Sequence, residues 1–190
     1  MAVLIYAPRR RRRRRSRTLS WRQILTLGVV LFAMFRVPVP DFDWPFGGAS
    51  DPVSSLAGSA AVIDGDTIEI QGRRIRLYGI DAPEAAQTCR DERDRSYRCG
   101  RRASSALSDK IGRRDVACEK RDVDAYKRIV AICYVDNLDI AAWLVREGWA
   151  VAYRRYSGIY VQAENEAKSA KRGIWAGPFT PPEDWRRANS

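Results

Sequence analysis

The residues whose types could do chemistry lie in two short segments of the chain. Residues 64–67 read Asp-Gly-Asp-Thr, and residues 76–84 read Arg-Leu-Tyr-Gly-Ile-Asp-Ala-Pro-Glu after one short predicted hairpin. Carboxylate oxygens suit a hard cation such as Ca²⁺, and the planar fork of a guanidinium suits a phosphate. The combination indicates metal-assisted hydrolysis of a phosphodiester. The alternative is a simple acidic turn beside a surface ion pair.

Composition limits the other possibilities. The chain has 190 residues and no histidine, which excludes Ser-His-Asp and Cys-His catalytic systems, histidine-ligated zinc and a histidine general base. The net charge of +11 favours a polyanionic partner. Residues 1–58 hold 10 basic and 3 acidic side chains, whereas residues 59–190 hold 24 and 20. Most of the excess charge therefore belongs to the N-terminal part.

The N-terminal part is predicted to be an appendage in three sections. Residues 1–23 include seven consecutive arginines, Arg9 to Arg15, and should be disordered because like charges repel. Residues 24–36 are almost free of polar groups and predict a signal anchor or transmembrane segment, although a full span needs ~20 apolar residues. Residues 37–58 predict a linker. The alternatives are a cleaved signal peptide, or a basic nucleic-acid-binding arm followed by a buried helix.

The charges and the cysteines both indicate export. Basic residues ahead of an apolar segment stay in the cytoplasm, so residues 59–190 should lie outside the inner membrane, in the periplasm or at the cell surface. Cleavage would release them as a secreted protein. The chain has four cysteines and no Cys-x-x-Cys pair, which favours disulfides in an oxidising compartment. The alternative is a cytosolic protein with four reduced, buried cysteines.

Four cysteines allow three pairings. Cys118 and Cys133 lie in two predicted strands whose connection suits antiparallel neighbours. Cys89 and Cys99 flank a polar, charged loop. We therefore predict the bridges Cys118–Cys133 and Cys89–Cys99.

Residues 59–190 otherwise read as short strands with inserted helices. Alternating and apolar runs predict a three-stranded meander over 60–78 and two strands around Cys118 and Cys133. An extended segment is also predicted over 149–153. Helical spacing of apolar residues, or a terminal glycine, predicts three helices, over 100–112, 140–147 and 160–172. The expected fold is α+β, mainly β: a small closed five-stranded barrel of the OB type with three helices.

The ordered set of motifs resembles the staphylococcal nuclease (thermonuclease) family from about Ala61 to Trp175. Asp-Gly-Asp-Thr alone is a weak signal because such turns are common. The full set at compatible spacings is specific. The matching segments are 62–67, 76–84, 124–131 (Asp-Ala-Tyr-Lys-Arg-Ile-Val-Ala), 144–150 (Leu-Val-Arg-Glu-Gly-Trp-Ala), Ala167-Lys168 and 173–175 (Gly-Ile-Trp).

The resemblance implies a role for each residue of the motifs. Asp66 and Asp81 would bind Ca²⁺, together with the main-chain carbonyl of Ala82, where the family usually has threonine. Asp64 would support the water shell of the metal. The other implied roles are these: Glu84 positions or deprotonates the attacking water, Arg76 and Arg128 bind the scissile phosphate, and Tyr153 and Tyr156 contact the nucleotide. Lys127 stands where the family commonly has glycine.

The function implied by the resemblance is calcium-dependent hydrolysis of single-stranded DNA and RNA with little sequence preference, leaving 3′-phosphate ends. The expected partners are nucleic acid and, through the N-terminal anchor, a membrane, with the protein itself a monomer. The alternative is a domain of the same fold that binds nucleic acid or protein without catalysis. Members that lose catalysis typically lose an acidic residue or an arginine, and here the set is complete, which favours the enzyme.

Overall fold

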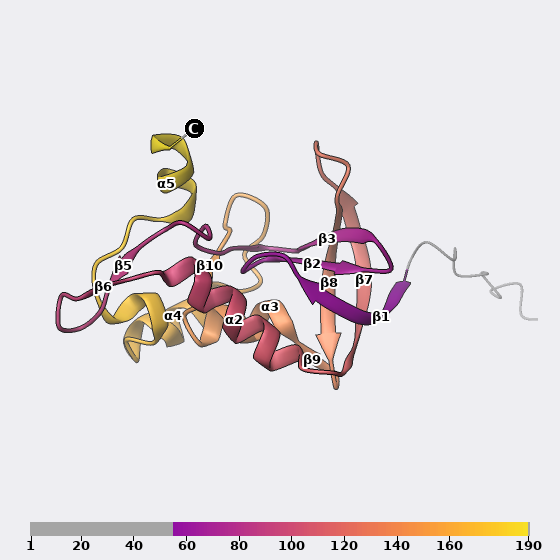
Figure 1. Cartoon of the computed structure of the whole chain (residues 1–190), viewed down its shortest axis with the longest axis horizontal. Coiled ribbons are helices and arrows are strands. Elements are labelled where there is room, and N and C mark those ends of the chain that lie inside the picture. The colour runs from indigo at the N-terminus through magenta and orange to yellow at the C-terminus, as the bar shows by residue number, and fades with distance from the viewer. Residues whose placement is uncertain (1–54, 190) are drawn as a thin grey trace, which may run out of the picture. The chain divides into compact units, whose positions relative to one another are not determined.

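Five strands close into a barrel at the centre of the domain (Figure 1). The computed structural model describes residues 55–189. The strands pair in the order β3-β2-β1-β7-β8, and β3 also pairs with β8, so the sheet closes on itself. The predicted five-stranded barrel is therefore confirmed. Its strands are β1 (Ser55–Val62), β2 (Thr67–Ile70), β3 (Arg73–Leu77), β7 (Asp115–Val123) and β8 (Ile129–Val135).

Side chains along the strands alternate between an apolar interior and a polar exterior. In β2, Ile68 and Ile70 are fully buried, while Glu69 between them lies opposite Arg74 of β3 on the other face. The first strand begins at Ser55, within the stretch that the sequence assigns to the linker, and there it pairs with Glu119 of β7. Pairing with two strands along its length makes β1 the link between the β2–β3 hairpin and the β7–β8 hairpin.

Closure of the barrel brings distant parts of the sequence together. Strands β3 and β8 run parallel, with Arg76 opposite Val130. Arg76 therefore lies close to the turn that precedes β8, and this turn contains Arg128. Two arginines that are far apart in the sequence reach one end of the barrel for this reason.

Helices cover the barrel at the three predicted places. They are α2 (Cys99–Ile111), α3 (Ile140–Arg146) and α4 (Val161–Ser169). Helix α2 buries Ala103, Leu107 and Ile111, which lie four residues apart along one face. Helix α3 follows the short strand β9 (Leu138–Asp139), and the carboxylate of Asp139 caps it by accepting a hydrogen bond from the backbone N–H of Ala142.

Two elements near the C-terminus were not predicted. They are the 3₁₀ helix η1 (Gly173–Ala176) and helix α5 (Pro182–Ala188). Figure 1 shows the chain running from α4 past β5 (Cys89–Arg90) and β6 (Ser96–Tyr97) before it reaches α5. The backbone N–H of Arg90 donates to the carbonyl of Pro178 and joins these segments. The predicted extended segment over 149–153 contains β10 (Val151–Ala152), which pairs with β4 (Ile80–Asp81).

Both predicted disulfides are present. Cys118 and Cys133 face each other across the antiparallel β7–β8 pair, and Cys89 is bonded to Cys99 at the start of α2. Within residues 55–189 no helix is long and apolar enough to cross a membrane. The predicted basic tail (1–23), anchor (24–36) and most of the linker (37–58) lie outside the described residues.

Candidate active site

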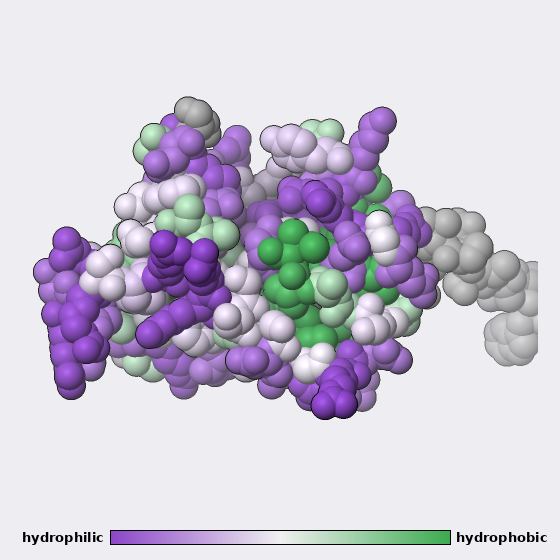
Figure 2. Space-filling view, in the orientation of Figure 1, coloured by the Kyte–Doolittle hydropathy of each residue, from purple (hydrophilic) through white to green (hydrophobic). Residues whose placement is uncertain are grey.

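A cavity of about 790 Å³ opens at the end of the barrel where Arg76 and Arg128 meet. Figure 2 shows the outline of the domain hollowed between α5 and the tip of the β7–β8 hairpin. Residues of α5 and of that tip line the cavity. So do eight of the nine predicted site residues: Asp64, Asp66, Arg76, Ala82, Glu84, Arg128, Tyr153 and Tyr156. Asp81 is the exception, with a side chain only 1% exposed.

Arg76 joins the two aspartates that the sequence predicts as metal ligands. Its Nη1 donates to Asp66 Oδ1 at 2.6 Å, and its Nη2 donates to Asp81 Oδ1 at 3.1 Å. Strand pairing sets this arrangement, because Thr67 lies opposite Arg76 and places Asp66 at the beginning of β2 beside it. Asp81 comes from β4, which β10 holds in place. Asp66, which directly precedes β2, and Asp81 of β4 therefore converge on one guanidinium of β3.

The buried carboxylates carry an electrostatic cost. Burial raises the pKa of Asp66 to about 7, against the lowering effect of Arg76, and the neighbouring Asp64 and Asp81 add to the rise. A cation beside Asp66 would favour its ionised form. The donor oxygens are hard, as Ca²⁺ or Mg²⁺ requires. The described residues contain no group of three or more acidic, histidine or cysteine side chains placed to hold a metal ion. Asp66 and Asp81 would supply two carboxylate groups to a hydrated divalent cation, and the predicted metal site at Asp66, Asp81 and the Ala82 carbonyl stays a prediction.

Asp64 shapes the turn between β1 and β2. Its Oδ1 accepts a hydrogen bond from the backbone N–H of Asp66 at 3.0 Å. The turn also needs Gly65, because an added Cβ would lie 2.7 Å from the Cβ of Ala82. This close approach allows the backbone N–H of Ala82 to donate to Asp66 Oδ2 at 2.9 Å. The observed contact of Asp64 is thus structural, and its predicted support of the metal's water shell stays a prediction.

Arg128 is positioned by a tight turn at the tip of the β7–β8 hairpin. The carboxylate of Asp124 accepts hydrogen bonds from the backbone N–H of Tyr126, the backbone N–H of Arg128 and Nε of Arg128. Lys127 adopts a left-handed backbone with φ +62°. Glycine reaches this conformation without steric cost, which accounts for a glycine at this position in the family. The turn aims Arg128 into the cavity from the side opposite α5.

Tyrosine rings form part of the cavity wall. The rings of Tyr153 and Tyr156, predicted to contact the nucleotide, have centroids 5.1 Å apart. Tyr126 also lines the cavity and is 82% exposed, although the sequence reasoning assigned it no role. Exposed aromatic faces beside guanidinium groups suit the stacking of unpaired bases.

The loop that carries Glu84 is fixed through its backbone. The backbone N–H of Glu84 donates to Oε1 of Gln87 at 3.2 Å, and the backbone N–H of Gln87 donates to the carbonyl of Glu84 at 2.8 Å. The first turn of α2 presses on the same place, since a Cβ at Gly100 would overlap the carbonyl oxygen of Glu84. The Glu84 side chain itself is 36% exposed and faces the cavity.

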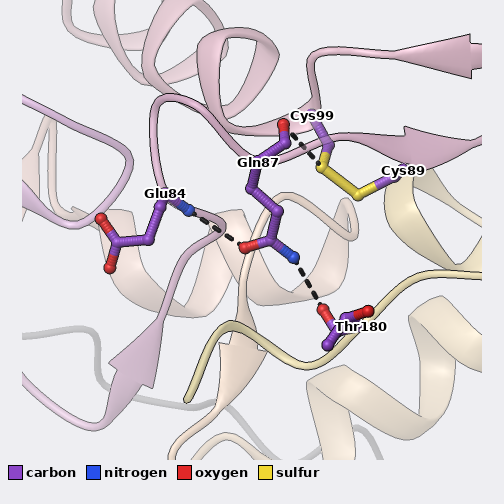
Figure 3. The surroundings of a disulfide bond; sticks show 5 residues. All are labelled: Glu84, Gln87, Cys89, Cys99 and Thr180. Atoms are coloured by element: carbon purple, nitrogen blue, oxygen red, sulfur yellow. Dashed lines mark hydrogen bonds between the residues drawn. A yellow bond between two sulfur atoms is a disulfide. The ribbon is translucent and has the colours of Figure 1, made fainter. Parts of the chain in front are cut away.

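Gln87 links this loop to a disulfide and to the C-terminal segment (Figure 3). Its side chain is fully buried, and its Nε2 donates to the carbonyl of Thr180 at 2.7 Å. Its carbonyl lies 3.5 Å from Sγ of Cys99, which is bonded to Cys89. The sequence reasoning missed Gln87, because a single glutamine in a polar loop gives no signal of burial.

Arg186 of α5 is the second site residue that the sequence reasoning missed. Its Nη1 donates to Asp81 Oδ1 and to Glu84 Oε1, both at 2.9 Å, and its Nη2 donates to Asp81 Oδ2 at 2.9 Å. Although burial alone would lower the pKa of Arg186, the hydrogen bonds that it donates to Asp81 and Glu84 raise it above its ordinary value. The only local signal is a pair of arginines near the C-terminus, which usually indicates a solvated surface.

Sequence comparisons agree with this fold. Residues 74–177 match the family described as Staphylococcal nuclease homologue. The chain is 40% identical over 153 residues to the Succinoglycan biosynthesis protein ExoI of Rhizobium meliloti, covering 79% of this chain and 75% of that protein. It is 33% identical over 146 residues to a Micrococcal nuclease of Shigella flexneri (67% and 78%), and 32% over 135 residues to an uncharacterized endonuclease of Haemophilus influenzae (66% and 70%). The chain belongs to the staphylococcal nuclease homologue family.

Proposed function

We propose that this protein is a calcium-dependent nuclease that hydrolyses phosphodiester bonds in single-stranded DNA and RNA with little sequence preference and leaves 3′-phosphate ends. The observation that carries the proposal is the meeting of Asp66, Arg76, Glu84 and Arg128 at one cavity, with Asp81 directly beneath it. Family membership supports the reaction class, and the chemistry of the donor oxygens supports calcium.

The charges of the site match the needs of the reaction. A phosphodiester resists attack because it is negatively charged, and a divalent cation bound at Asp66 and Asp81 would offset that charge. Arg76 and Arg128 enter the cavity from β3 and from the hairpin tip, so they can hold a phosphate between them through planar, bidentate hydrogen bonds. The charge that builds on the phosphate oxygens is thereby stabilised.

Glu84 is the candidate group for activating water. Its backbone is held by Gln87 and by the start of α2, whereas its carboxylate reaches the cavity. A carboxylate placed in this way can orient a water molecule and accept its proton as the water attacks phosphorus. Chain flexibility at Glu84 would reduce this effect, which gives the rigid backbone a functional reason.

Single strands are the proposed substrate because bases must be unpaired to stack on the tyrosines of the wall.

We further propose that residues 24–36 anchor the protein in the inner membrane, with the nuclease domain outside the cytoplasm. Cleavage of this segment would instead secrete the domain. In both cases the protein is proposed to be a monomer. The two disulfides support an oxidising compartment. Protease added to intact spheroplasts should digest the domain and spare the arginine run. A domain that resists the protease and has reduced cysteines would contradict the proposed topology but not the proposed nuclease activity.

The decisive experiment is an assay of the purified full-length protein on labelled single-stranded DNA and RNA. We expect cleavage with Ca²⁺, none with EGTA, and recovery when Ca²⁺ is restored. End analysis should show 3′-phosphates. Full activity after exhaustive chelation would contradict the role of the metal. Binding of DNA without hydrolysis under all conditions would instead support the non-catalytic alternative.

A further inference from the structure

Helix α5 places a guanidinium on the carboxylates that the proposed function assigns to the cation and to the attacking water. We propose that Arg186 is a tethered competitor of the cation: it pairs with Asp81 and Glu84 in the resting protein and has to leave Asp81 before a divalent cation can bind there. The inference rests on the proposed function, because it concerns the same site. It adds a regulatory residue that the motifs of the family do not contain.

The contacts of Asp81 show why the two occupants exclude each other. Arg186 donates to both carboxylate oxygens of Asp81, and Arg76 shares one of them. The Asp81 side chain is only 1% exposed and does not line the cavity, whereas Arg186 does. Arg186 therefore lies between Asp81 and the cavity. A divalent cation at Asp81 would meet two guanidinium groups at close range, and like charges repel strongly where solvent is excluded.

Arg186 is the guanidinium that can leave. Arg76 is 18% exposed, lies within β3 and also binds Asp66, so the barrel holds it from both sides. Arg186 is 35% exposed and comes from a short terminal helix in which Pro182 is the only buried residue. Few apolar contacts have to break for this helix to move, and segments of this kind open at low free energy.

The segment ahead of α5 stays attached and acts as the tether. Gly177 packs so closely on the carbonyls of Arg90 and Asp91 that a Cβ there would overlap them. The carbonyl of Thr180 accepts a hydrogen bond from the buried Gln87. Beyond this anchor, Glu183 of α5 also pairs with Arg155 at 2.9 Å, and this ion pair is weak because the Arg155 side chain is 71% exposed. The helix can therefore swing about an anchored base.

The same movement would release the candidate base. Nη1 of Arg186 binds Asp81 and Glu84 together, so both lose their partner in one step. While the pairing lasts, Arg186 occupies Oε1 of Glu84, which a water molecule would otherwise contact. Cation affinity is reduced by the fraction of time that Asp81 is occupied. The site would consequently activate over a higher range of Ca²⁺ concentration than its carboxylates alone require.

The test is a calorimetric titration of Ca²⁺ into the full-length protein and three variants. R186Q should bind Ca²⁺ about tenfold tighter than wild type, within the range usual for coupled sites. R186K should lie between them, because lysine keeps the charge without the two-pronged contact. R187Q is the matched control: within residues 55–189, Arg187 forms ion pairs with Glu183 and Asp184 of its own helix and not with the site, and its variant should bind as wild type does.

Hydrogen exchange supplies a readout that does not depend on activity. In wild type, Ca²⁺ should increase amide exchange in residues 182–189 and leave β7 and β8 protected. If R186Q bound Ca²⁺ no more tightly than wild type, this inference would be overturned and the proposed function would stand. If R186Q also bound substrate more weakly, Arg186 would instead be a phosphate ligand. Absence of Ca²⁺ binding in all four proteins would overturn the calcium dependence and this inference together.

Discussion

The barrel and the region next to it are stabilised in different ways. The barrel buries a continuous apolar cluster that includes Ile68, Ile75 and Leu144. The loop–tail region, defined here as residues 85–99 with 177–189, contributes to a much smaller cluster around Cys89, Cys99 and Ile174. Each of the two regions contains one disulfide. The barrel therefore has packing to hold it together, whereas the loop–tail region depends on its disulfide, on Gln87 and on ion pairs.

The candidate site is divided between these two regions. The barrel carries Asp66, Arg76 and Arg128 in strands and a tight turn. The loop–tail region holds the backbone of Glu84 and contributes Arg186 to the site. We therefore expect changes in the barrel to affect stability and activity together, and changes in the loop–tail region to affect activity with little loss of stability.

The largest expected effect concerns Glu84. Glu84→Gln should lower kcat by at least ~10²-fold, the lower part of the usual range for loss of an acid–base group. Nucleic-acid binding and the melting temperature should change little, because the backbone contacts of Glu84 remain. Single-turnover kinetics and thermal unfolding measure the two effects. Glu92→Gln, an exposed change in the same loop, is the control. Near-wild-type turnover of Glu84→Gln would show that the water is activated elsewhere.

Arg76→Lys tests the barrel side of the comparison. The change should abolish most activity and also destabilise the fold by about 1–3 kcal/mol, since buried Asp66 and Asp81 lose hydrogen bonds to a charged donor. Chemical denaturation of the Ca²⁺-free protein measures the change in the free energy of unfolding. Arg73→Lys, at an exposed position of the same strand, should do neither. If Arg76→Lys were inactive but as stable as wild type, Arg76 would behave like a residue of the loop–tail region, whose changes affect activity without stability.

The two disulfides give the most direct comparison. Cys118→Ala with Cys133→Ala opens a loop of 15 residues and should lower the free energy of unfolding by about 3 kcal/mol. Cys89→Ala with Cys99→Ala should lower it by less than that, because that loop is exposed and shorter. The activity of this second double variant should fall more steeply than that of the first. The reason is that the disulfide holds the loop of Gln87, which contacts both Glu84 and Thr180. Equal losses of stability and activity in the two double variants would remove the distinction between the regions.

The smallest effect is expected at Glu164 of α4, which lies outside the loop–tail region. Its carboxylate accepts hydrogen bonds from Lys168, Arg154 and the backbone N–H of Ala152 in β10, the partner of the strand that holds Asp81. Burial would raise the pKa of Glu164, but these hydrogen bonds lower it below its ordinary value of 4.5. Glu164→Gln should destabilise the protein by about 1–2 kcal/mol near neutral pH.

The pH dependence of that loss has a definite sign. A carboxyl with a lowered pKa binds fewer protons in the folded state, so its contribution is present above pH 4.5 and disappears as the pH falls through the folded pKa. Denaturation of wild type and variant at several pH values should therefore converge in acid. Glu166→Gln, an exposed change in the same helix, is the control. A difference that persists unchanged in strong acid would assign the effect to packing.

Local sequence determined much of the barrel and most of the candidate residues. Alternation of apolar side chains predicted the strands, and helical spacing or a terminal glycine predicted α2, α3 and α4, because these periods reflect contacts between near neighbours. The pairing of Cys118 with Cys133 followed from the same logic, since successive strands usually pair. Residues 64–84 predicted a carboxylate and guanidinium site because its members are close in the chain.

Tertiary structure alone decided what joins the site to the rest of the molecule. Arg186 meets Asp81 across 105 positions of sequence, and Gln87 meets Thr180 across 93. No periodicity marks either contact, because α5 buries only Pro182 and Gln87 lies in a polar loop. Their positions follow from barrel closure through the parallel β3–β8 pair and from the fold of the C-terminal segment across the Cys89–Cys99 loop. Such contacts depend on the whole chain being folded, which is why the sequence predicted candidate residues that meet at one site but not Arg186, which covers Asp81.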